Sequence, residues 1–202
     1  NRDVRGGAAI SPRFRGAAPW LTETLFSIRR LVGILEAERS SRRWPLAGEG
    51  MDLSSLITRG GVWYNVPGKD PAEFVEALAA TLRLPDGVSP NDLAMACARR
   101  EANSPTAMGR GLAFPHPGTP LIADAGRAMV ALAYSRFPVD WKAPDGAPVR
   151  AAFLILSATR NEHLTTLSAL AKLCGDGEFY AALGRRAPLE DIVALLGKKT
   201  PA

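Results

Sequence analysis

The sequence contains few of the residues from which metal centres and disulfide frameworks are built. Its 202 residues include two cysteines and two histidines. Cys97 and Cys174 lack the spacing of a metal motif and are too few for a disulfide framework, so we expect both to be reduced core residues. A zinc site that combines them with the histidines is the weaker alternative. The pattern therefore signals neither a metal nor a cofactor.

Long apolar runs are also missing. No run approaches the length of a membrane-spanning helix, and nothing at the start has the charged, apolar and small-residue segments of a signal peptide. We therefore expect a cytoplasmic protein without a membrane span. The apolar fraction of 47% and the charged fraction of 22% are those of an ordinary globular protein.

The positive charge is concentrated at one end of the chain. Residues 1–50 carry nine Arg and five acidic residues, whereas residues 51–202 are nearly neutral. We therefore divide the chain into a basic N-terminal tail, helix and linker (1–50) and a main domain (51–202). Because no basic footprint covers the whole molecule, we do not expect nucleic-acid binding. Binding through the Arg-rich arm alone is the remaining alternative.

Residues 20–39 have the pattern of an amphipathic helix. Apolar residues recur at intervals of four and three, which places them on one stripe: Leu21, Leu25, Ile28, Val32 and Leu35. We interpret this segment as a helix that lies on the main domain. The alternative is a helix that docks a partner or forms a homodimer.

The main domain shows one strand, two helices, three strands and three helices. The predicted strands are 61–66, 111–114, 128–134 and 151–157, and residues 53–57 form at most one helical turn before them. Caps and first-turn prolines at 70–71 and 89–90 open the first two helices, and the last three cover 162–173, with Asn161 as the cap, 177–183 and 189–196. Consecutive strands without helices between them argue against a doubly wound fold. The order β-α-α-β-β-β-α-α-α predicts an α+β domain with three α/β/α layers and a mixed sheet.

The two histidines are the candidates for chemistry. His116 stands between Pro115 and Pro117 at the end of a predicted strand, on a conformationally stiff stem. His163 lies in the first turn of a predicted helix, where the helix dipole favours a bound anion and a neutral imidazole. Spacing alone leaves two hypotheses open. The histidines share one site, or they are an unrelated strand-end residue and cap-region residue.

Several motifs resemble the enzyme IIA domain of the fructose/mannitol class. This class belongs to the bacterial phosphoenolpyruvate-dependent sugar phosphotransferase system and includes nitrogen-regulatory relatives. The resemblance extends from Met51 to about Leu196. It is carried by Arg100-Glu101, Thr106, Gly109, Gly111, the run Leu-Ala-Phe-Pro-His at 112–116, and the segment Glu162-His163-Leu164 to Lys172.

The resemblance implies a role for five of these residues. His116 would accept a phosphoryl group, with the tele nitrogen as the candidate position, from a phosphohistidine carrier protein similar to HPr. His163 would hydrogen-bond that group, Arg100 would lie near it, and Thr106 and Gly109 would belong to the phosphate-binding set. The acceptor would be an enzyme IIB or a regulatory target, and the basic arm favours the regulatory role. This chemistry needs no metal. The alternative is a non-catalytic interaction module of the same fold.

Two loops depart from the family pattern. The chain reads Ser104-Pro105-Thr106-Ala107 where the family commonly reads Gly-Ser-Thr-Gly, and Pro117 replaces a small residue after the histidine. These changes stiffen or enlarge positions that are usually small, so they bear on how the loops accommodate partners. They leave the proposed nucleophile in place.

Overall fold

A computed structural model of the protein describes residues 52–199. The predicted tail, the helix at 20–39 and the domain boundary at residue 51 therefore lie outside the described residues. Within residues 52–199 the fold is α+β with a mixed five-stranded sheet, as the element order predicted. Both cysteines are buried and free, and burial raises the pKa of each thiol to about 12.

The sheet has the strand order β1-β4-β5-β3-β2. Parallel pairs join β1 to β4 and β3 to β5, while β4–β5 and β2–β3 are antiparallel. The strands are β1 (Val62–Val66), β2 (Ala107–Gly109), β3 (Leu112–Ala113), β4 (Met129–Val139) and β5 (Val149–Leu156). The two long strands are therefore central, and the short β3 lies directly beside β5.

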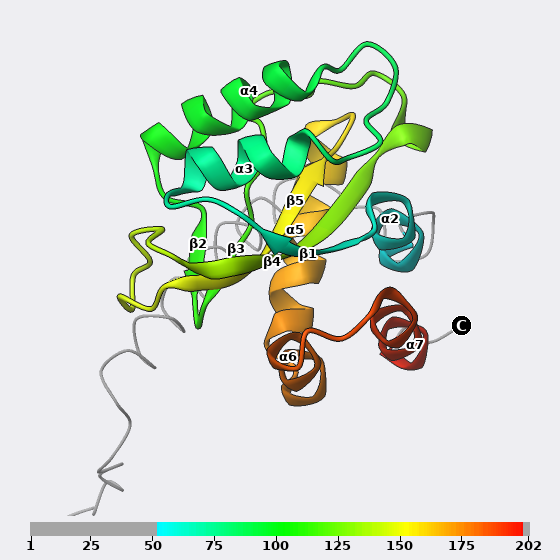
Figure 1. Ribbon diagram of the computed structural model, residues 1–202. Coiled ribbons are helices and arrows are strands. Elements are labelled where there is room, and N and C mark those ends of the chain that lie inside the picture. The colour runs from blue at the N-terminus through cyan, green and yellow to red at the C-terminus, as the bar shows by residue number, and fades with distance from the viewer. Residues whose placement is uncertain (1–51, 200–202) are drawn as a thin grey trace, which may run out of the picture.

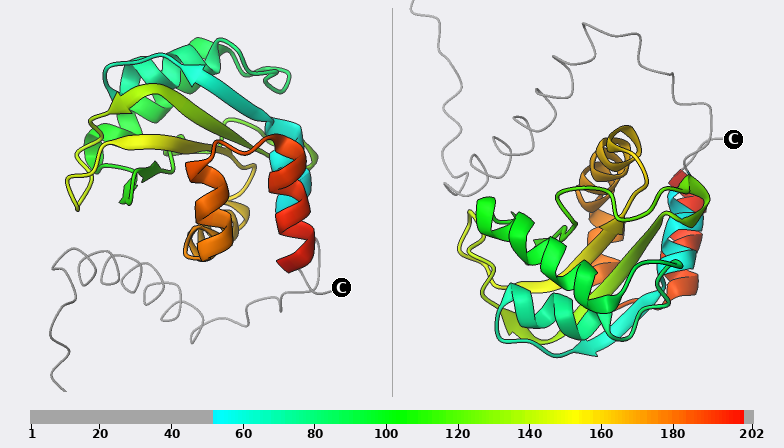
Figure 2. Two further views of the ribbon diagram at one scale, coloured as in Figure 1. Left: turned by 60° about the horizontal axis from the view of Figure 1, so that its bottom comes forward. Right: turned by 90° about the horizontal axis from the view of Figure 1, so that it is seen from above.

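Helices cover both faces of this sheet, which gives the three layers. One face carries α3 (Pro71–Ala79) and α4 (Pro90–Asn103), and the other carries α2 (Leu53–Gly60), α5 (Arg160–Cys174), α6 (Gly177–Gly184) and α7 (Leu189–Lys199) (Figures 1 and 2). A 3-10 turn, η1 (Ala125–Arg127), precedes β4. Asp70 and Ser89 accept hydrogen bonds as the N-caps of α3 and α4, each ahead of a first-turn proline.

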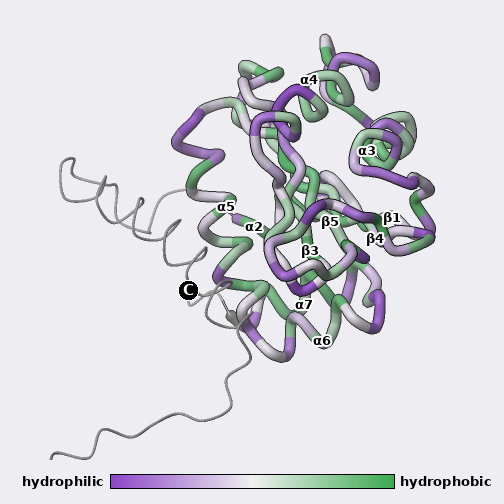
Figure 3. Tube along the Cα trace, turned by 90° about the vertical axis from the view of Figure 1, so that its left-hand side faces the viewer, coloured by the Kyte–Doolittle hydropathy of each residue, from purple (hydrophilic) through white to green (hydrophobic). Residues whose placement is uncertain are grey.

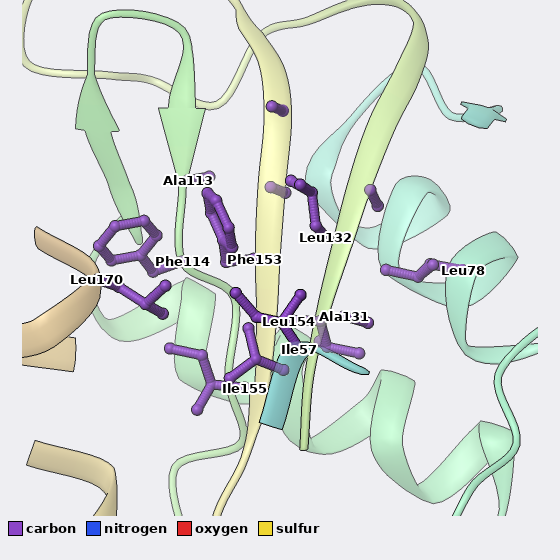
Figure 4. Close-up of a cluster of buried hydrophobic side chains, with 14 of the residues drawn as sticks. Ile57, Leu78, Ala113, Phe114, Ala131, Leu132, Phe153, Leu154, Ile155 and Leu170 are labelled. Atoms are coloured by element: carbon purple, nitrogen blue, oxygen red, sulfur yellow. The ribbon is translucent and has the colours of Figure 1, made fainter. Parts of the chain in front are cut away.

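The core lies on both sides of β4 and β5, because both strands are almost continuously apolar. Hydrophobic colouring runs along β5 and β3, and hydrophilic colouring gathers on the helix turns and loops (Figure 3). Phe153 of β5 packs edge-on against Phe114, with ring centroids 5.7 Å apart. Leu132 of β4 is the register partner of Phe153, and its side chain lies between β5 and Leu78 (Figure 4). Phe114, which lies two residues before His116, is thus anchored in the core.

The structure corrects four details of the predicted elements. Strand β2 was not predicted, because three edge-strand residues with a glycine show no alternation. Helix α2 has eight residues rather than one turn, since Asp52 caps it. Strand β4 continues to Val139 through an exposed stretch that contains Pro138. Helix α5 begins at Arg160 with Thr159, not Asn161, as its N-cap.

Gly60 is expected to be essential for packing α2 onto the sheet. A Cβ added there would lie 2.2 Å from the carbonyl oxygen of Val130 in β4, whereas one added at Gly184 would meet no atom within 4 Å. We expect Gly60→Ala to lower the free energy of unfolding by about 1–3 kcal/mol. Gly184→Ala should leave it unchanged or raise it by up to about 1 kcal/mol. Urea denaturation of both variants measures this, and equal stabilities would contradict the prediction.

Candidate active site

Sheet topology brings the segments that carry the two histidines to one edge. Strands β3 and β5 are parallel neighbours in which Leu112 pairs with Ala151. Their C-terminal ends therefore leave the sheet on the same side. His116 lies three residues after β3, and His163 lies in the first turns of the helix that follows β5. The carbonyl of Pro115 accepts a hydrogen bond from the Ile155 amide (3.0 Å), which ties the first segment to β5.

The imidazole of His116 is held at both of its nitrogens. Nδ1 lies 2.8 Å from the carbonyl oxygen of Phe114, and the residue is 8% exposed. Because a carbonyl oxygen can only accept a hydrogen bond, Nδ1 carries the proton. Nε2 then holds the lone pair, and it accepts a hydrogen bond from Nε of Arg100 at 3.1 Å. The nucleophilic nitrogen of the neutral ring is therefore Nε2.

His163 stacks obliquely beside this ring. The two imidazole centroids are 4.4 Å apart at an angle of 48°. Thr159 caps the helix by accepting from the Glu162 amide, and Glu162 accepts in turn from the Ala158 amide. This arrangement is close to a capping box and fixes where the first turn starts. Of the two hypotheses left open by spacing, the geometry supports a shared site.

Arg100 completes the group from the last turn of α4. Its Nη1 donates to the carbonyl oxygen of Ser104 at 2.9 Å, so the guanidinium bridges the end of α4 and His116. Gly118 lies against the aliphatic part of the Arg100 side chain. A half-buried guanidinium beside two imidazoles supplies the donors and the charge that a phosphoryl group requires.

Both imidazoles are neutral at physiological pH. Burial, as the largest cause, together with the neighbouring His116 and Arg100 lowers the pKa of His163 to about 4. Burial also lowers the pKa of His116, and the Arg100 charge adds to this, while the hydrogen bond to Phe114 opposes it. A neutral imidazole at Nε2 is a competent nucleophile, whereas an imidazolium is not.

The structure places Thr106 and Gly109 differently from these three residues. Thr106 donates its backbone N–H and its hydroxyl to the two carboxylate oxygens of Glu101, at 2.8 and 2.6 Å. Gly109 lies at the tip of the β2–β3 hairpin with φ +81°, next to Asp145. Its conformational freedom therefore serves the hairpin turn. The closest side chain to this glycine is that of Asp145, not an imidazole.

Sequence reasoning did not assign a role to Glu101. Its pairing with Thr106 links the end of a helix to the start of a strand, and no periodic pattern predicts such a contact. The departures from the family pattern surround this pair. Pro105 is exposed, Ala107 is buried in β2, and Pro117 is half-buried after His116.

The described residues contain neither a metal-binding cluster nor a membrane-spanning helix. Between residues 52 and 199, no cluster of three or more His, Cys, Asp or Glu side chains could hold a metal ion. Within that same range, no helix combines the length and apolar character that crossing a membrane requires.

The family of the chain follows from a direct match. Residues 55–199 match the family described as "Phosphoenolpyruvate-dependent sugar phosphotransferase system, EIIA 2". The chain belongs to this family. Among curated IIA relatives, the "PTS system 2-O-alpha-mannosyl-D-glycerate-specific EIIABC component" of Escherichia coli is 27% identical over 154 residues, or 74% of this chain and 23% of that protein. The chain thus spans about a quarter of that relative's length.

A second curated relative of this IIA domain is named for regulation. The "Nitrogen regulatory protein" of Pseudomonas aeruginosa is 30% identical over 125 residues, which are 60% of this chain and 79% of that protein. Among solved structures, the nitrogen regulatory protein IIA-Ntr from Neisseria meningitidis is 26% identical, with a TM-score of 0.59, and the match covers 71% of this chain and 97% of that one. The mannitol IIA of Escherichia coli, solved in complex with phosphorylated IIB, is 19% identical with a TM-score of 0.51 over 69% and 96% of the chains, and shows the fold alone.

Proposed function

We propose that this IIA domain is a phosphoryl carrier with His116 as the acceptor. The observation that supports this most directly is the hydrogen bond from Nδ1 to the Phe114 carbonyl. It keeps the proton on Nδ1, so that Nε2 presents a lone pair without any prior deprotonation. The donor would be the phosphohistidine of an HPr-like carrier protein.

The transfer needs no change in the protonation of His116. The lone pair of Nε2 attacks phosphorus, the Nε2–P bond forms, the donor's N–P bond breaks, and the electron pair returns to the donor imidazole. The proton on Nδ1 stays in its bond to Phe114, whose carbonyl stabilises the positive charge that develops on the ring. Such transfers depend on in-line positioning and on stabilising charge at the equatorial oxygens.

Arg100 and His163 have complementary parts in this proposal. Because Arg100 Nε occupies the Nε2 lone pair in the structure, it must turn aside before the attack. Its guanidinium then faces the incoming phosphoryl oxygens, where one such pair at about 4 Å has a raw Coulomb term of roughly 4 kcal/mol in an intermediate dielectric. The neutral imidazole of His163 contributes an N–H donor without adding a charge.

Loss of phosphorylation on removal of one imidazole is the test of this proposal. Incubation with phosphoenolpyruvate, the first enzyme of the system and its carrier protein should add one phosphate to the chain. We expect His116→Ala to abolish this, and 31P NMR to show the phosphorus on Nε2. The matched control is His163→Gln, which should be phosphorylated more slowly on the same nitrogen. Absence of phosphate with cognate proteins, or its presence on His116→Ala, would contradict the proposal.

We also propose that the phosphoryl state has a regulatory role. The nitrogen regulatory relatives are 30% and 26% identical over 79% and 97% of their own length, whereas the EIIABC relative is matched over 23% of its length and the mannitol IIA, although matched over 96%, is 19% identical. An enzyme IIB is the competing acceptor. Mixing the phosphorylated protein with IIB domains separates the two roles, because rapid transfer to a IIB cysteine would favour sugar transport.

A further inference from the structure

The carboxylate of Glu101 is connected to the His116 ring by a continuous chain of hydrogen bonds. Glu101 accepts from the amide (2.8 Å) and hydroxyl (2.6 Å) of Thr106. The carbonyl of Thr106 accepts from the Phe114 amide at 3.0 Å. The carbonyl of Phe114 accepts from His116 Nδ1 at 2.8 Å. Every link after the first depends on where Thr106 is held.

We propose that Glu101 is a positioning residue that fixes the tautomer and the placement of His116 through Thr106 and Phe114. This inference rests on the proposed role of His116 as the phosphoryl acceptor. Glu101 touches neither the imidazole nor the phosphoryl group, and it acts by holding the strand that supplies the carbonyl acceptor for Nδ1.

The short β2 strand explains why such a tether is needed. β2 has three residues, lies at the edge of the sheet, and pairs with β3 at two positions with a register shift between them. The Thr106–Phe114 hydrogen bond extends this ladder by one step toward His116. With so few bonds of its own, β2 is held in place by contacts from outside the sheet.

Separate contacts hold the two ends of the hairpin. At its tip, the Arg110 guanidinium lies 3.8 Å from the Tyr180 ring centroid, and the Tyr180 hydroxyl donates to the Arg110 carbonyl at 2.9 Å. At the His116 end, Thr106 is 6% exposed and both of its donors go to Glu101. Hydrogen bonds from buried donors to a carboxylate are the strong, geometrically specific kind.

The end of α4 thereby controls both nitrogens of one imidazole. Arg100 contacts Nε2 directly, and its neighbour Glu101 sets the partner of Nδ1 through two strands. Glu101 and Pro115 also line a pocket of about 270 Å³ between α3 and α4. Because Glu101 borders this open pocket, shortening its side chain leaves no sealed cavity, and Glu101→Ala is expected to fold.

The test is the tautomer of His116 in the 202-residue chain. The protein has two histidines, so 15N-histidine labelling gives two sets of ring signals, and the 15N shifts report which nitrogen carries the proton. At pH 7.5 we expect wild-type His116 to be protonated at Nδ1. In Glu101→Ala we expect its shifts to move toward a tautomer mixture. Phosphorylation at saturating carrier should slow about tenfold, with KM for the carrier little changed.

Matched variants distinguish a specific effect of Glu101 on His116 from a general loosening of the hairpin. Tyr180→Phe removes one hydrogen bond, to the Arg110 carbonyl, at the opposite end of the hairpin and should leave the His116 shifts unchanged. Thr106→Val removes one bond to Glu101 while keeping the shape, so it should shift the tautomer in the same direction by less. If Glu101→Ala does not fold, Thr106→Val decides. Wild-type shifts in these variants, or an equal change in Tyr180→Phe, would overturn the inference.

The outcomes also distinguish this inference from the proposed function. A tautomer change in a protein that no carrier phosphorylates would support the positioning role and refute the carrier role. Normal phosphorylation of Glu101→Ala with an unchanged His116 spectrum would do the reverse.

Discussion

Replacing Arg100 with alanine should slow phosphoryl transfer to His116 by about 100- to 1,000-fold, the loss typical of removing one preorganised donor from a transition state. The guanidinium already lies 3.1 Å from Nε2, so it needs only a side-chain rotation to reach oxygens carried by that nitrogen. Its Nη1 donates to the Ser104 carbonyl, which places the guanidinium at the site. The measurement is the single-turnover rate with phosphorylated carrier protein.

Arg100→Ala should also change the pKa values of His116 and His163, and this effect can be measured separately from the rate. The Arg100 charge is one cause that lowers the pKa of both His116 and His163. Its removal should therefore raise both pKa values toward their ordinary range, which NMR titration of the two imidazoles would detect. A ring that is easier to protonate but slower to be phosphorylated would separate the electrostatic role of Arg100 from its role as a donor.

Two variants control this prediction. Arg99 is exposed and precedes Arg100 on α4, so Arg99→Ala removes the same charge and should leave the rate unchanged. Arg100→Lys keeps the charge but loses the forked donor geometry, so it should recover part of the rate. An Arg100→Ala rate within about threefold of the wild type would contradict the proposed role.

Local signals predicted most of the elements that carry the site. Pro115 and Pro117 indicated an extended, stiff segment at His116, and the apolar run at β5 was followed by the helix that carries His163. What brings the two rings to a centroid distance of 4.4 Å is the parallel pairing of β3 with β5. Pairing partners are set by the whole sheet, and the residues of a two-residue strand cannot encode them.

Contacts that the sequence could not predict join residues of different elements. The two hydrogen bonds from Thr106 to Glu101 depend on the angle at which α4 leads into β2. Tyr180 donates a hydrogen bond to Arg110, which lies 70 residues earlier in the chain. At the start of α5, Thr159 and Asn161 are both acceptable caps, and packing of the preceding β5 decides between them. In each case the residue types were suitable, and tertiary geometry selected the partner.

The neutral histidine pair should make the fold sensitive to mild acid. The pKa of His163 is about 4 in the folded protein and close to 6.5 in an unfolded chain. Between these values the unfolded chain binds a proton that the folded protein excludes. The free energy of unfolding must therefore decrease as the pH falls below about 6.5, and this contribution levels off below pH 4.

The loss of stability should be measurable between pH 7 and pH 5. From pH 7 to pH 5, His163 should account for a loss of about 1–2 kcal/mol in the free energy of unfolding, allowing for the water that reaches its partly exposed ring. His116, whose pKa is also lowered, adds to the loss in the same direction. The lowered pKa values of Asp52 and Asp140 act only below their ordinary value of 3.8, outside this window.

Urea denaturation at pH 7, 6 and 5 isolates this contribution. His163→Gln removes the titrating group, so its stability should depend less on pH than that of the wild type, and His116→Gln should flatten the remainder. Because the chain has no third histidine, the double variant should be nearly independent of pH in this range. A wild-type stability that stays constant, or rises, between pH 7 and pH 5 would mean that the rings are not held neutral. The readiness of Nε2 for attack would then lose its physical basis.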